Sequence, residues 1–282
     1  MKIVITGATG ALGSFIAIFF IKKYKLFRFG FKKKTQYNLN LFNQKKLILI
    51  LKKIKPDVVI NCAGFTNVDK CQEDFNYGYK NNVLIVNSLI SAFLYLKKKP
   101  HFFHFSTDQV YNSSAKNSEN NVRLTNNYSV IKYISELEAQ KYKKTTILRT
   151  NFFGTSYLSY RKTFSGYIAS ELKKGGKIKL PNNIFFNPLN LEILCQTVER
   201  LMINKIYGIF NIGSKGTISK FEFGKMVANK LKLDSKLIKK YTSHYNIDKR
   251  PLNTVVSTEK IQKILNFKFE RIKNNLVDNE II

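Results

Sequence analysis

Tyr128 and Lys132 are the two residues of this sequence whose types and spacing indicate chemistry most directly. Residues that stand four positions apart lie on the same face of a helix, so the phenol and the ammonium would be neighbours in a helical segment. A nearby positive charge favours the phenolate and lowers a tyrosine pKa that is ordinarily about 10. Tyr128 would then act as a proton donor or acceptor near neutral pH.

A glycine pattern at the start of the chain indicates the partner of that chemistry. Gly7, Gly10 and Gly13 follow a short apolar run and open a segment of helical length. Glycines in this context allow a tight turn and let the backbone approach a pyrophosphate on the helix N-terminus, although a generic strand-to-helix turn is the structural alternative. A dinucleotide beside a tuned tyrosine can move a hydride and a proton onto a carbonyl. We expect cofactor contacts from Gly7, Thr9, Gly10, Ala11, Leu12 and Gly13.

Two more clusters come where predicted strands end, which is where ligands of open α/β sheets bind. The segment from Asn61 to Gly64 has small residues that would let a cofactor approach. Ser106 and Thr107 follow the next strand, where a hydroxyl could hydrogen-bond a substrate carbonyl and share its proton with Tyr128. A turn-forming Ser-Thr-Asp cluster is the alternative for that segment. We expect further cofactor contacts from Asn61, Ala63, Gly64, Ser106, Tyr128 and Lys132.

The elements that must position these residues alternate along the first half of the chain. Strands are predicted at Lys2 to Thr6, Lys25 to Phe31, Asp57 to Asn61, His101 to Ser106 and Thr145 to Arg149. Helices are predicted at Ala11 to Tyr24, Asn43 to Lys55 and Thr125 to Tyr142, and the segment from Asn76 to Leu96 is predicted to contain another. Such alternation implies βαβ units and a parallel sheet covered on both faces, that is, a Rossmann-type doubly wound α/β fold.

The alternation loosens after about residue 150. Helices are predicted at Thr163 to Lys174, Leu189 to Asn204, Lys220 to Lys232 and Thr258 to Leu265, and a late strand at Tyr207 to Ile212. We therefore expect an NAD(P)-binding Rossmann domain over residues 1–150. Residues 151–282 would form a smaller C-terminal substrate-binding lobe, partly interleaved with the end of the sheet.

Composition limits the partners of this chain. Its 282 residues, 44% of them hydrophobic, can bury a substantial core, and the net charge of +30 raises the question of nucleic-acid binding. The lysines are spread over the whole chain and form no single block. Asn, Ile, Phe, Tyr and Lys are all abundant and Trp is absent, a composition typical of A/T-rich coding bias, so we expect no nucleic-acid partner. The surface would still attract an anionic substrate.

Two local features bear on the compartment. Cys62, Cys71 and Cys195 lack metal or redox spacing, which favours free thiols in a reducing compartment, and no ligand cluster predicts a metal. The nearly uncharged run from Ile3 to Ile21 could pass for a signal peptide or a membrane anchor. Because polar and glycine residues divide it into strand, turn and helix, we expect a cytoplasmic protein without membrane insertion.

The end of the second predicted strand bears on the choice of dinucleotide. An acidic residue there would bind the 2′-hydroxyl of NAD, and none is present. The cations Arg28, Lys32, Lys33 and Lys34 could instead accept a 2′-phosphate. NADPH or NADH is therefore expected, with NADPH favoured, and the general excess of lysine is the alternative explanation for these cations.

Taken in order, the motifs resemble a known family. The chain is similar to extended short-chain dehydrogenases/reductases, and among them to the dTDP-4-dehydrorhamnose reductase-like group, over nearly its whole length. The resemblance rests on the glycine turn, Asn61 to Asp69, Ser106 to Tyr111, Tyr128-x-x-x-Lys132, Leu148 to Asn151 and Arg250 to Thr254. It implies NAD(P)H-dependent reduction of the 4-keto group of a nucleotide-activated deoxysugar for a surface polysaccharide, with a homodimer as one option.

The resemblance also implies roles for the matching residues. Tyr128 would protonate the alkoxide as the nicotinamide delivers hydride, Lys132 would hold the nicotinamide ribose, and Thr107 would orient the substrate carbonyl. Asn82 matches an asparagine of the family. The chain departs from the family at Asn40, where Asp is common, and in the segment after Asn151, where Trp is common. The sugar site would be lined by Thr66, Val68, Asn151, Phe152, Arg250 and Asn253.

Two other functions fit the same pattern. A nucleotide-sugar epimerase or dehydratase of the same superfamily would retain its NAD, and Asp108 beside Thr107 could supply the acid that a dehydratase needs. A regulatory subunit like that of methionine adenosyltransferase would bind the dinucleotide and a partner enzyme without catalysis. The presence of Thr107, Tyr128 and Lys132 argues against this last function.

Overall fold

The computed structural model describes residues 1–31, 35–154, 162–244 and 250–275. The cations predicted to bind a 2′-phosphate at Lys32, Lys33 and Lys34 lie outside these residues. The chain divides into two compact units. Unit 1 comprises Met1–Ser106, Asn126–Leu148 and Thr197–Ile209, and unit 2 comprises Thr107–Thr125, Arg149–Gln196 and Phe210–Ile282. The assignment of cofactor binding to residues 1–150 and of substrate binding to residues 151–282 stays a prediction.

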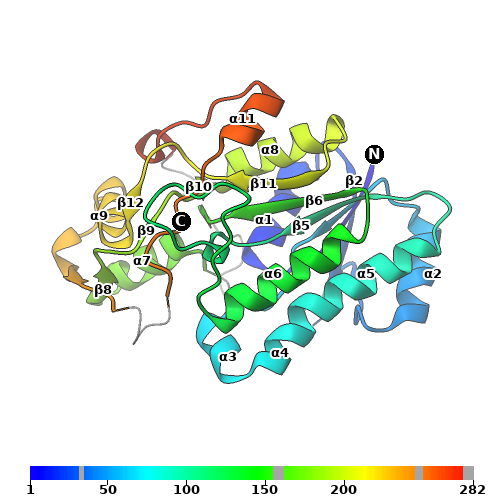
Figure 1. Ribbon diagram of the computed structural model, residues 1–282, viewed down its shortest axis with the longest axis horizontal. Coiled ribbons are helices and arrows are strands. Elements are labelled where there is room, and N and C mark those ends of the chain that lie inside the picture. Colours follow the sequence, from blue (N-terminus) through cyan, green and yellow to red (C-terminus); the bar gives the residue numbers. More distant parts are fainter. Residues whose placement is uncertain (32–34, 155–161, 245–249, 276–282) are drawn as a thin grey trace. The chain divides into compact units, whose positions relative to one another are not determined.

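A seven-stranded sheet organises the first unit, with the strand order β11-β6-β5-β4-β1-β2-β3 (Figure 1). Each neighbouring pair from β6 to β3 is parallel, and helices flank the sheet. The predicted Rossmann-type doubly wound α/β fold is therefore confirmed. The strands are β1 (Lys2–Thr6), β2 (Lys25–Gly30), β3 (Tyr37–Asn38), β4 (Val58–Asn61), β5 (His101–Phe105), β6 (Thr145–Thr150) and β11 (Gly208–Ile212).

Three helices of unit 1 pack against the sheet with side chains that form one buried cluster. Leu47, Phe93 and Ala139 come from three different helices and join Val59 and Phe102 of the sheet in this cluster. Fully burying a side chain such as Leu47 stabilises the fold by roughly 1.5–3 kcal/mol. The helices are α1 (Ala11–Phe20), α2 (Gln44–Ile54), α3 (Val68–Glu73), α4 (Phe75–Tyr79), α5 (Ile85–Leu94) and α6 (Asn127–Gln140).

The segment from Asn76 to Leu96, predicted to contain a helix, holds the end of α4 and the whole of α5. A π-helical turn, η1 (Lys80–Leu84), separates α4 from α5. Asn82 lies within this turn, and its side-chain amide donates to the carbonyl of Gly78 at 2.9 Å. An apolar period does not reveal such a turn, because the period reports which face is buried and not how the backbone is hydrogen-bonded. π-helical turns occur frequently at functional sites.

The second unit contains short strand pairs and helices around its own core, which includes Phe153, Ile168, Leu180, Phe186 and Phe223. The strands of two residues escaped prediction because they are too short for a period of two to be recognised. The strands are β7 (Phe152–Phe153), β8 (Ile178–Pro181), β9 (Phe185–Phe186), β10 (Leu189–Asn190), β12 (Ile218–Ser219) and β13 (Ile238–Tyr241). The helices are α7 (Phe164–Lys173), α9 (Lys220–Lys230) and α11 (Glu259–Leu265), with shorter turns η2 (Asp108–Val110), η3 (Ser235–Leu237) and η4 (Ile272–Asn275). Helix α8 (Leu191–Ile203) has its first residues in unit 2 and the rest, from Thr197, in unit 1.

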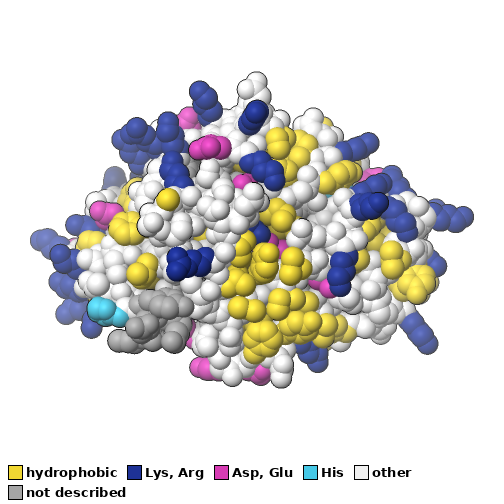
Figure 2. All heavy atoms as spheres, in the orientation of Figure 1, with side chains coloured by type: hydrophobic (Ala, Val, Ile, Leu, Met, Phe, Trp, Pro, Cys, Tyr) yellow, Lys and Arg dark blue, Asp and Glu magenta, His cyan; other side chains and the backbone are white. Residues whose placement is uncertain are grey.

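The surface carries its cations at many places. Figure 2 shows lysine and arginine side chains at separate sites on the face in view, between polar and apolar groups. Among the helices of the described ranges, none has both the length and the apolar character that crossing a membrane requires.

Candidate active site

The glycine turn of unit 1 joins β1 to α1 and is closed toward the protein at two of its three glycines. Gly7 has a φ of +63°, and an added Cβ there would lie 2.6 Å from the backbone of Cys62 and Ala63. An added Cβ at Gly13 would lie 2.3 Å from the carbonyl oxygen of Gly7. At Gly10, the Gly7 oxygen at 3.2 Å is the one described atom within 4 Å of such a Cβ, chain neighbours apart. The turn is therefore open at Gly10, which suits the close approach of a pyrophosphate.

The start of α1 presents the other residues predicted to contact the cofactor. Thr9 precedes the helix, Gly10 is its N-cap without a side-chain hydrogen bond, and Ala11 and Leu12 form its first turn. The first N–H groups of a helix have no partner within the helix and, together with the helix dipole, favour an anion. The first turn of α1 contains no acidic residue. Nothing in that turn therefore opposes a negatively charged pyrophosphate.

The loop after β4 is held in place by Asn82. Its Oδ1 accepts the N–H of Phe65 at 3.3 Å, and its Nδ2 donates to the carbonyls of Phe65 at 3.1 Å and Gly78 at 2.9 Å. An added Cβ at Gly64 would lie 2.9 Å from Asn82 Oδ1, so glycine permits this approach. Because Asn82 is only 2% exposed, its hydrogen bonds fix the segment that includes the predicted cofactor residues Ala63 and Gly64.

A row of buried polar side chains runs from β1 to α6. Thr6, Asn61 and His104 are paired in register on the adjacent strands β1, β4 and β5. Thr6 Oγ1 donates to Asn61 Oδ1 at 2.6 Å, and Asn61 Nδ2 donates to His104 Nδ1 at 3.2 Å. The neutral ring therefore carries its proton on Nε2, which donates to Ser135 Oγ at 3.0 Å, and Ser135 Oγ donates to the carbonyl of Lys132 at 2.7 Å. Burial holds the pKa of His104 well below its usual range, in agreement with a neutral imidazole.

Helix α6 begins at a defined residue and carries Tyr128 on a buried face. Asn126 Oδ1 accepts the N–H of Ser129 at 2.8 Å, and Ser129 Oγ accepts the N–H of Asn126 at 3.1 Å. This capping box fixes the first turn of the helix. Tyr128 and Lys132 are 6% and 5% exposed, so both members of the predicted pair are buried.

The ammonium of Lys132 lies at the carboxyl end of β5, where its Nζ donates to the carbonyl of Phe105 at 2.8 Å. Burial lowers the pKa of Lys132 to about 8, against smaller contributions from Glu136 and Cys71 that raise it. Glu136, one turn further along α6, is fully buried and accepts a hydrogen bond from Ser106 Oγ. Glu136 stands four residues after Lys132, a spacing that places the two side chains on the same helix face. Because glutamate on a helix is ordinarily exposed, the sequence did not distinguish Glu136 from other surface residues.

In unit 2, the carboxylate of Asp108 gathers three segments of the chain. It accepts hydrogen bonds from Thr254 Oγ1 at 2.6 Å, Asn151 Nδ2 at 3.2 Å and Thr107 Oγ1 at 3.3 Å. Thr107 is the N-cap of η2, and its Oγ1 also accepts the N–H of Gln109 at 3.2 Å. Burial raises the pKa of Asp108, and the hydrogen bonds from Thr254 and Asn151 oppose that rise. Unit 2 thus brings the predicted residues Thr107 and Asn151 together around Asp108.

Other predicted substrate residues also lie in unit 2. The predicted residue Arg250 acts by its charge on a buried lysine of α9, Lys220. Burial lowers the pKa of Lys220, the charge of Asp108 opposes this decrease, and the charge of Arg250 adds to it. Asn253 Oδ1 accepts the N–H of Val255 at 3.0 Å. Phe152 belongs to β7, which pairs with β10.

The residues predicted to bind cofactor or substrate, or to act in catalysis, are divided between the two units. Thr66 and Val68 lie just before and at the start of α3, in unit 1 together with the predicted cofactor residues, Tyr128 and Lys132. Unit 2 holds Thr107, Asn151, Phe152, Arg250 and Asn253. The predicted sharing of a proton between Thr107 and Tyr128, and the role of each residue, stay predictions.

A comparison with known families decides the class of this chain. The family model described as RmlD substrate binding domain matches residues 1–279. The chain belongs to the RmlD substrate binding domain family. The predicted kinship with the dTDP-4-dehydrorhamnose reductase-like group is thereby confirmed, and with it an oxidoreductase at the level of the family.

Two curated relatives and one solved structure each match this chain over more than 90% of its length. The chain is 23% identical over 270 residues to the spore coat polysaccharide biosynthesis protein SpsK of Bacillus subtilis (strain 168), covering 93% of this chain and 91% of that protein. It is 23% identical over 288 residues to a dTDP-4-dehydrorhamnose reductase of Aggregatibacter actinomycetemcomitans, covering 93% and 92%. The crystal structure of dTDP-4-dehydrorhamnose reductase from Bacillus anthracis str. Ames, in complex with NADP, matches with a TM-score of 0.86 at 20% identity, covering 98% and 96%.

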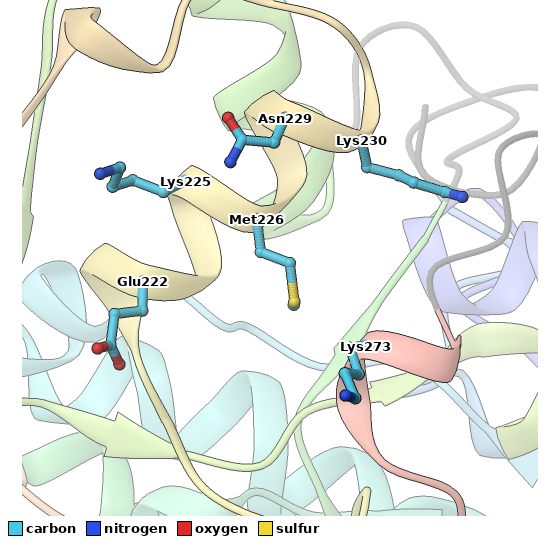
Figure 3. Close-up of a pocket in the computed structure, with 6 residues that line it drawn as sticks. All are labelled: Glu222, Lys225, Met226, Asn229, Lys230 and Lys273. Atoms are coloured by element: carbon cyan, nitrogen blue, oxygen red, sulfur yellow. The ribbon is translucent and has the colours of Figure 1, made fainter.

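The described residues of unit 2 form a surface pocket. It is lined by Glu222, Lys225, Met226, Asn229 and Lys230 of α9 and by Lys273 of η4 (Figure 3). None of these residues was predicted to bind cofactor or substrate.

The remaining expectations concern metals and thiols. Within the described ranges, no group of three or more His, Cys, Asp or Glu side chains could hold a metal ion, and the absence of a metal stays a prediction. Cys62, Cys71 and Cys195 are free thiols, as the sequence indicated.

Proposed function

We propose that this chain uses NADPH or NADH to reduce the 4-keto group of a nucleotide-activated deoxysugar similar to dTDP-4-dehydrorhamnose, in the biosynthesis of a surface polysaccharide. The observation that carries the proposal is the buried pair Tyr128 and Lys132 on α6, with the Lys132 ammonium bound to the carbonyl of Phe105 at the end of β5. The same unit contains the glycine turn, which is open at Gly10. The names of the relatives, reductases and a polysaccharide biosynthesis protein, support the substrate class.

In the proposed reaction, Tyr128 gives its phenolic proton to the C4 oxygen of the sugar, where negative charge develops as C4 is reduced to the alcohol. When bound, the nicotinamide supplies the hydride and is oxidised. The ammonium of Lys132 favours the phenolate that remains on Tyr128, which later takes a proton from solvent. Thr107 would orient the carbonyl oxygen by turning its one hydroxyl proton from Asp108, to which it donates at 3.3 Å, toward that oxygen, while its Oγ1 still accepts the N–H of Gln109.

The glycine turn and the loop after β4 would hold the dinucleotide. The pyrophosphate would lie beside Gly10 on the first N–H groups of α1, and Ala63 and Gly64 would give it room. Arg28, which is exposed on β2, is the described member of the cation group that favours NADPH over NADH.

The bonding of Asp108 bears on the dehydratase alternative. A dehydratase would use this carboxyl as an acid toward its substrate, but three donors of its own unit already bind it. A carboxyl engaged in this way is suited to holding Thr107 and less suited to exchanging a proton with a sugar. We therefore place the reductase before the dehydratase.

The test is oxidation of NADPH or NADH, followed by the loss of nicotinamide absorbance, with dTDP-4-keto-6-deoxy sugars supplied one at a time. Oxidation that requires a keto sugar supports the reductase, and the faster dinucleotide is the preferred one. If no sugar supports oxidation although the dinucleotide binds tightly, the reductase is wrong and an enzyme with retained NAD or a regulatory subunit gains weight.

A matched pair of variants tests the role of Tyr128. Tyr128→Phe should lower kcat by about 10²–10⁴-fold while dinucleotide affinity stays close to that of the parent chain, because only the proton donor is removed. Tyr133→Phe makes the same substitution on the same helix at a residue without a proposed role and should retain turnover. Equal activity of the two variants would contradict the assignment.

Partners and compartment belong to the same proposal. We propose a cytoplasmic enzyme whose partner is the nucleotide-sugar, without nucleic-acid binding or membrane insertion, and with a homodimer as an option. A second copy could cover Leu84 of η1, Leu94 of α5 and Leu137 of α6, which are 40%, 68% and 47% exposed. Sedimentation equilibrium tests the dimer, and a nucleic-acid affinity that falls steeply with salt would contradict the expected absence of that partner.

A further inference from the structure

Residues at the carboxyl end of β5 form hydrogen bonds with side chains from two successive turns of α6. The carbonyl of Phe105 accepts the Lys132 ammonium at 2.8 Å, and the hydroxyl of the next residue, Ser106, donates to the Glu136 carboxylate. The backbone of Ser106 is itself fixed, because its N–H donates to the carbonyl of Leu148 at 2.8 Å. Two consecutive residues of the strand end therefore hold a cation and an anion that stand one helical turn apart.

All three side chains of this arrangement are withdrawn from water. Glu136 is 0% exposed, Lys132 is 5% exposed and Ser106 is 9% exposed. A buried carboxylate is costly unless it is paired with a charge and hydrogen-bonded. Ser106 gives the Glu136 carboxylate a hydrogen bond, and the charge of Glu136 favours the protonated form of Lys132.

The other titratable groups whose charge acts on Lys132 come from α3 and β5. Burial, followed by the charge of Asp74, raises the pKa of the Cys71 thiol, and burial holds the pKa of His104 well below its usual range. Near neutral pH, the thiol and the imidazole are therefore uncharged and give Lys132 no counter-charge. Of the two contributions that raise the pKa of Lys132, that of Glu136 is the larger and that of Cys71 the smaller.

We propose that Glu136 is a positioning residue that keeps Lys132 protonated in its buried place, and that Ser106 anchors the Glu136 carboxylate for this purpose. Without the anion, burial would remove the proton from Lys132 at a lower pH. An uncharged Lys132 would no longer favour the phenolate of Tyr128. The consequence for turnover rests on the proposed reductase function, whereas the state of the Lys132 proton can be measured without turnover.

The primary experiment is an NMR titration of Lys132 in the full chain labelled with ¹³C at the lysine ε carbon. The Lys132 signal is assigned by its loss in Lys132→Arg. Glu136→Gln removes the charge but retains the shape and an oxygen that can accept from Ser106. Glu138→Gln is the matched control, because it makes the same substitution two residues further along α6, where the carboxylate pairs with Lys141.

The expected result is that Glu136→Gln lowers the pKa of Lys132 by at least about one unit, a ten-fold weaker hold on the proton, whereas Glu138→Gln leaves it within a few tenths of a unit. Equal titration of Lys132 in the parent chain and in Glu136→Gln overturns the proposal. If Glu136→Gln does not fold, Glu136→Asp moves the carboxylate back by one methylene and should lower the pKa of Lys132 by a smaller amount. An unchanged titration in that variant overturns the proposal as well.

The pH profile of kcat gives a second measurement once a keto sugar is found. Glu136→Gln should move the alkaline limb of the profile to lower pH by the same interval that NMR reports. A purely structural defect would instead lower kcat at every pH without moving the limb, and that result overturns the positioning role. Failure to find any substrate contradicts the proposed function alone, since the titration still decides the relation between Glu136 and Lys132.

Discussion

Substitution by alanine should lower the stability of the protein at Gly13 but the affinity for the cofactor at Gly10, although both residues lie in one turn. Gly13 is buried in α1, and its added Cβ would meet the carbonyl oxygen of Gly7 at 2.3 Å and the carbonyl carbon at 2.9 Å. Gly10 is the N-cap with a φ of −84°, a conformation open to any residue, and its added Cβ meets that oxygen at 3.2 Å. The first substitution strains the protein itself, and the second extends into the space proposed for the pyrophosphate.

The distances set the size of each effect. Overpacking against fixed backbone costs typically about 1–3 kcal/mol, and Gly13→Ala belongs near the top of this range because the backbone cannot rotate away. Replacing glycine by alanine inside a helix by itself stabilises the helix by up to about 1 kcal/mol. Set against an overpacking cost near ~3 kcal/mol, this gain leaves a decrease of about 2 kcal/mol in the free energy of unfolding. Gly10→Ala loses a favourable N-cap and tightens one contact, which should cost less than about 1 kcal/mol.

The assay measures stability and cofactor binding on the same samples. Urea unfolding followed by far-UV circular dichroism gives the free energy of unfolding, and the fluorescence of bound NADPH gives its affinity without a tryptophan background, because the chain contains no Trp. Gly13→Ala should unfold at a lower urea concentration than the parent chain. Gly10→Ala and Gly10→Val should unfold close to the parent chain but bind NADPH more weakly, and the loss of affinity should be larger for Gly10→Val. Parental stability of Gly13→Ala would refute the packing argument, and parental NADPH affinity of Gly10→Val would refute the assigned site.

Three further substitutions test the hydrogen bonds and the buried charge, each by urea unfolding. Asn82→Ala removes three hydrogen bonds that hold the loop at Phe65 and should lower the free energy of unfolding by about 2–3 kcal/mol; a loss below about 1 kcal/mol would contradict that role. Thr254→Val removes the 2.6 Å donor to buried Asp108 and should cost about 1.5–3 kcal/mol, while Thr254→Ser, which keeps the donor, should stay near the parent. Burial lowers the pKa of Lys132 from 10.5 to about 8, so the unfolded chain holds this proton more tightly, and the free energy of unfolding should rise between pH 8 and 10.5 by up to about 3 kcal/mol. Lys132→Met should abolish that rise, and a rise that persists in the variant would have another origin.

Local patterns identified much of this protein before its structure was known. The alternation of strands and helices needs only the apolar period and the turn residues between segments, and both are local properties of the chain. Glycines directly after β1 and small residues directly after β4 predicted where a cofactor could approach the backbone, and that approach stays a prediction. What the structure shows is that an added Cβ at Gly7 would meet the backbone of Cys62 and Ala63, and one at Gly64 would meet Asn82. The spacing of Tyr128 and Lys132 placed both on one helix face, which the structure confirms by their common burial.

Features that depend on two distant segments were decided only by the tertiary structure. The register of β1, β4 and β5 aligns Thr6, Asn61 and His104 into one hydrogen-bonded row, and no local pattern specifies a register between strands that are tens of residues apart. The same holds for Glu136, which the sequence presents as one more polar residue of a helix and which the end of β5 buries against Ser106. The sequence by itself determined which residues share a helix face or follow a strand, because backbone geometry repeats every few residues. Which of those faces lost its water, and which charges were thereby forced to pair, was decided only when strands distant in the chain came together in one sheet.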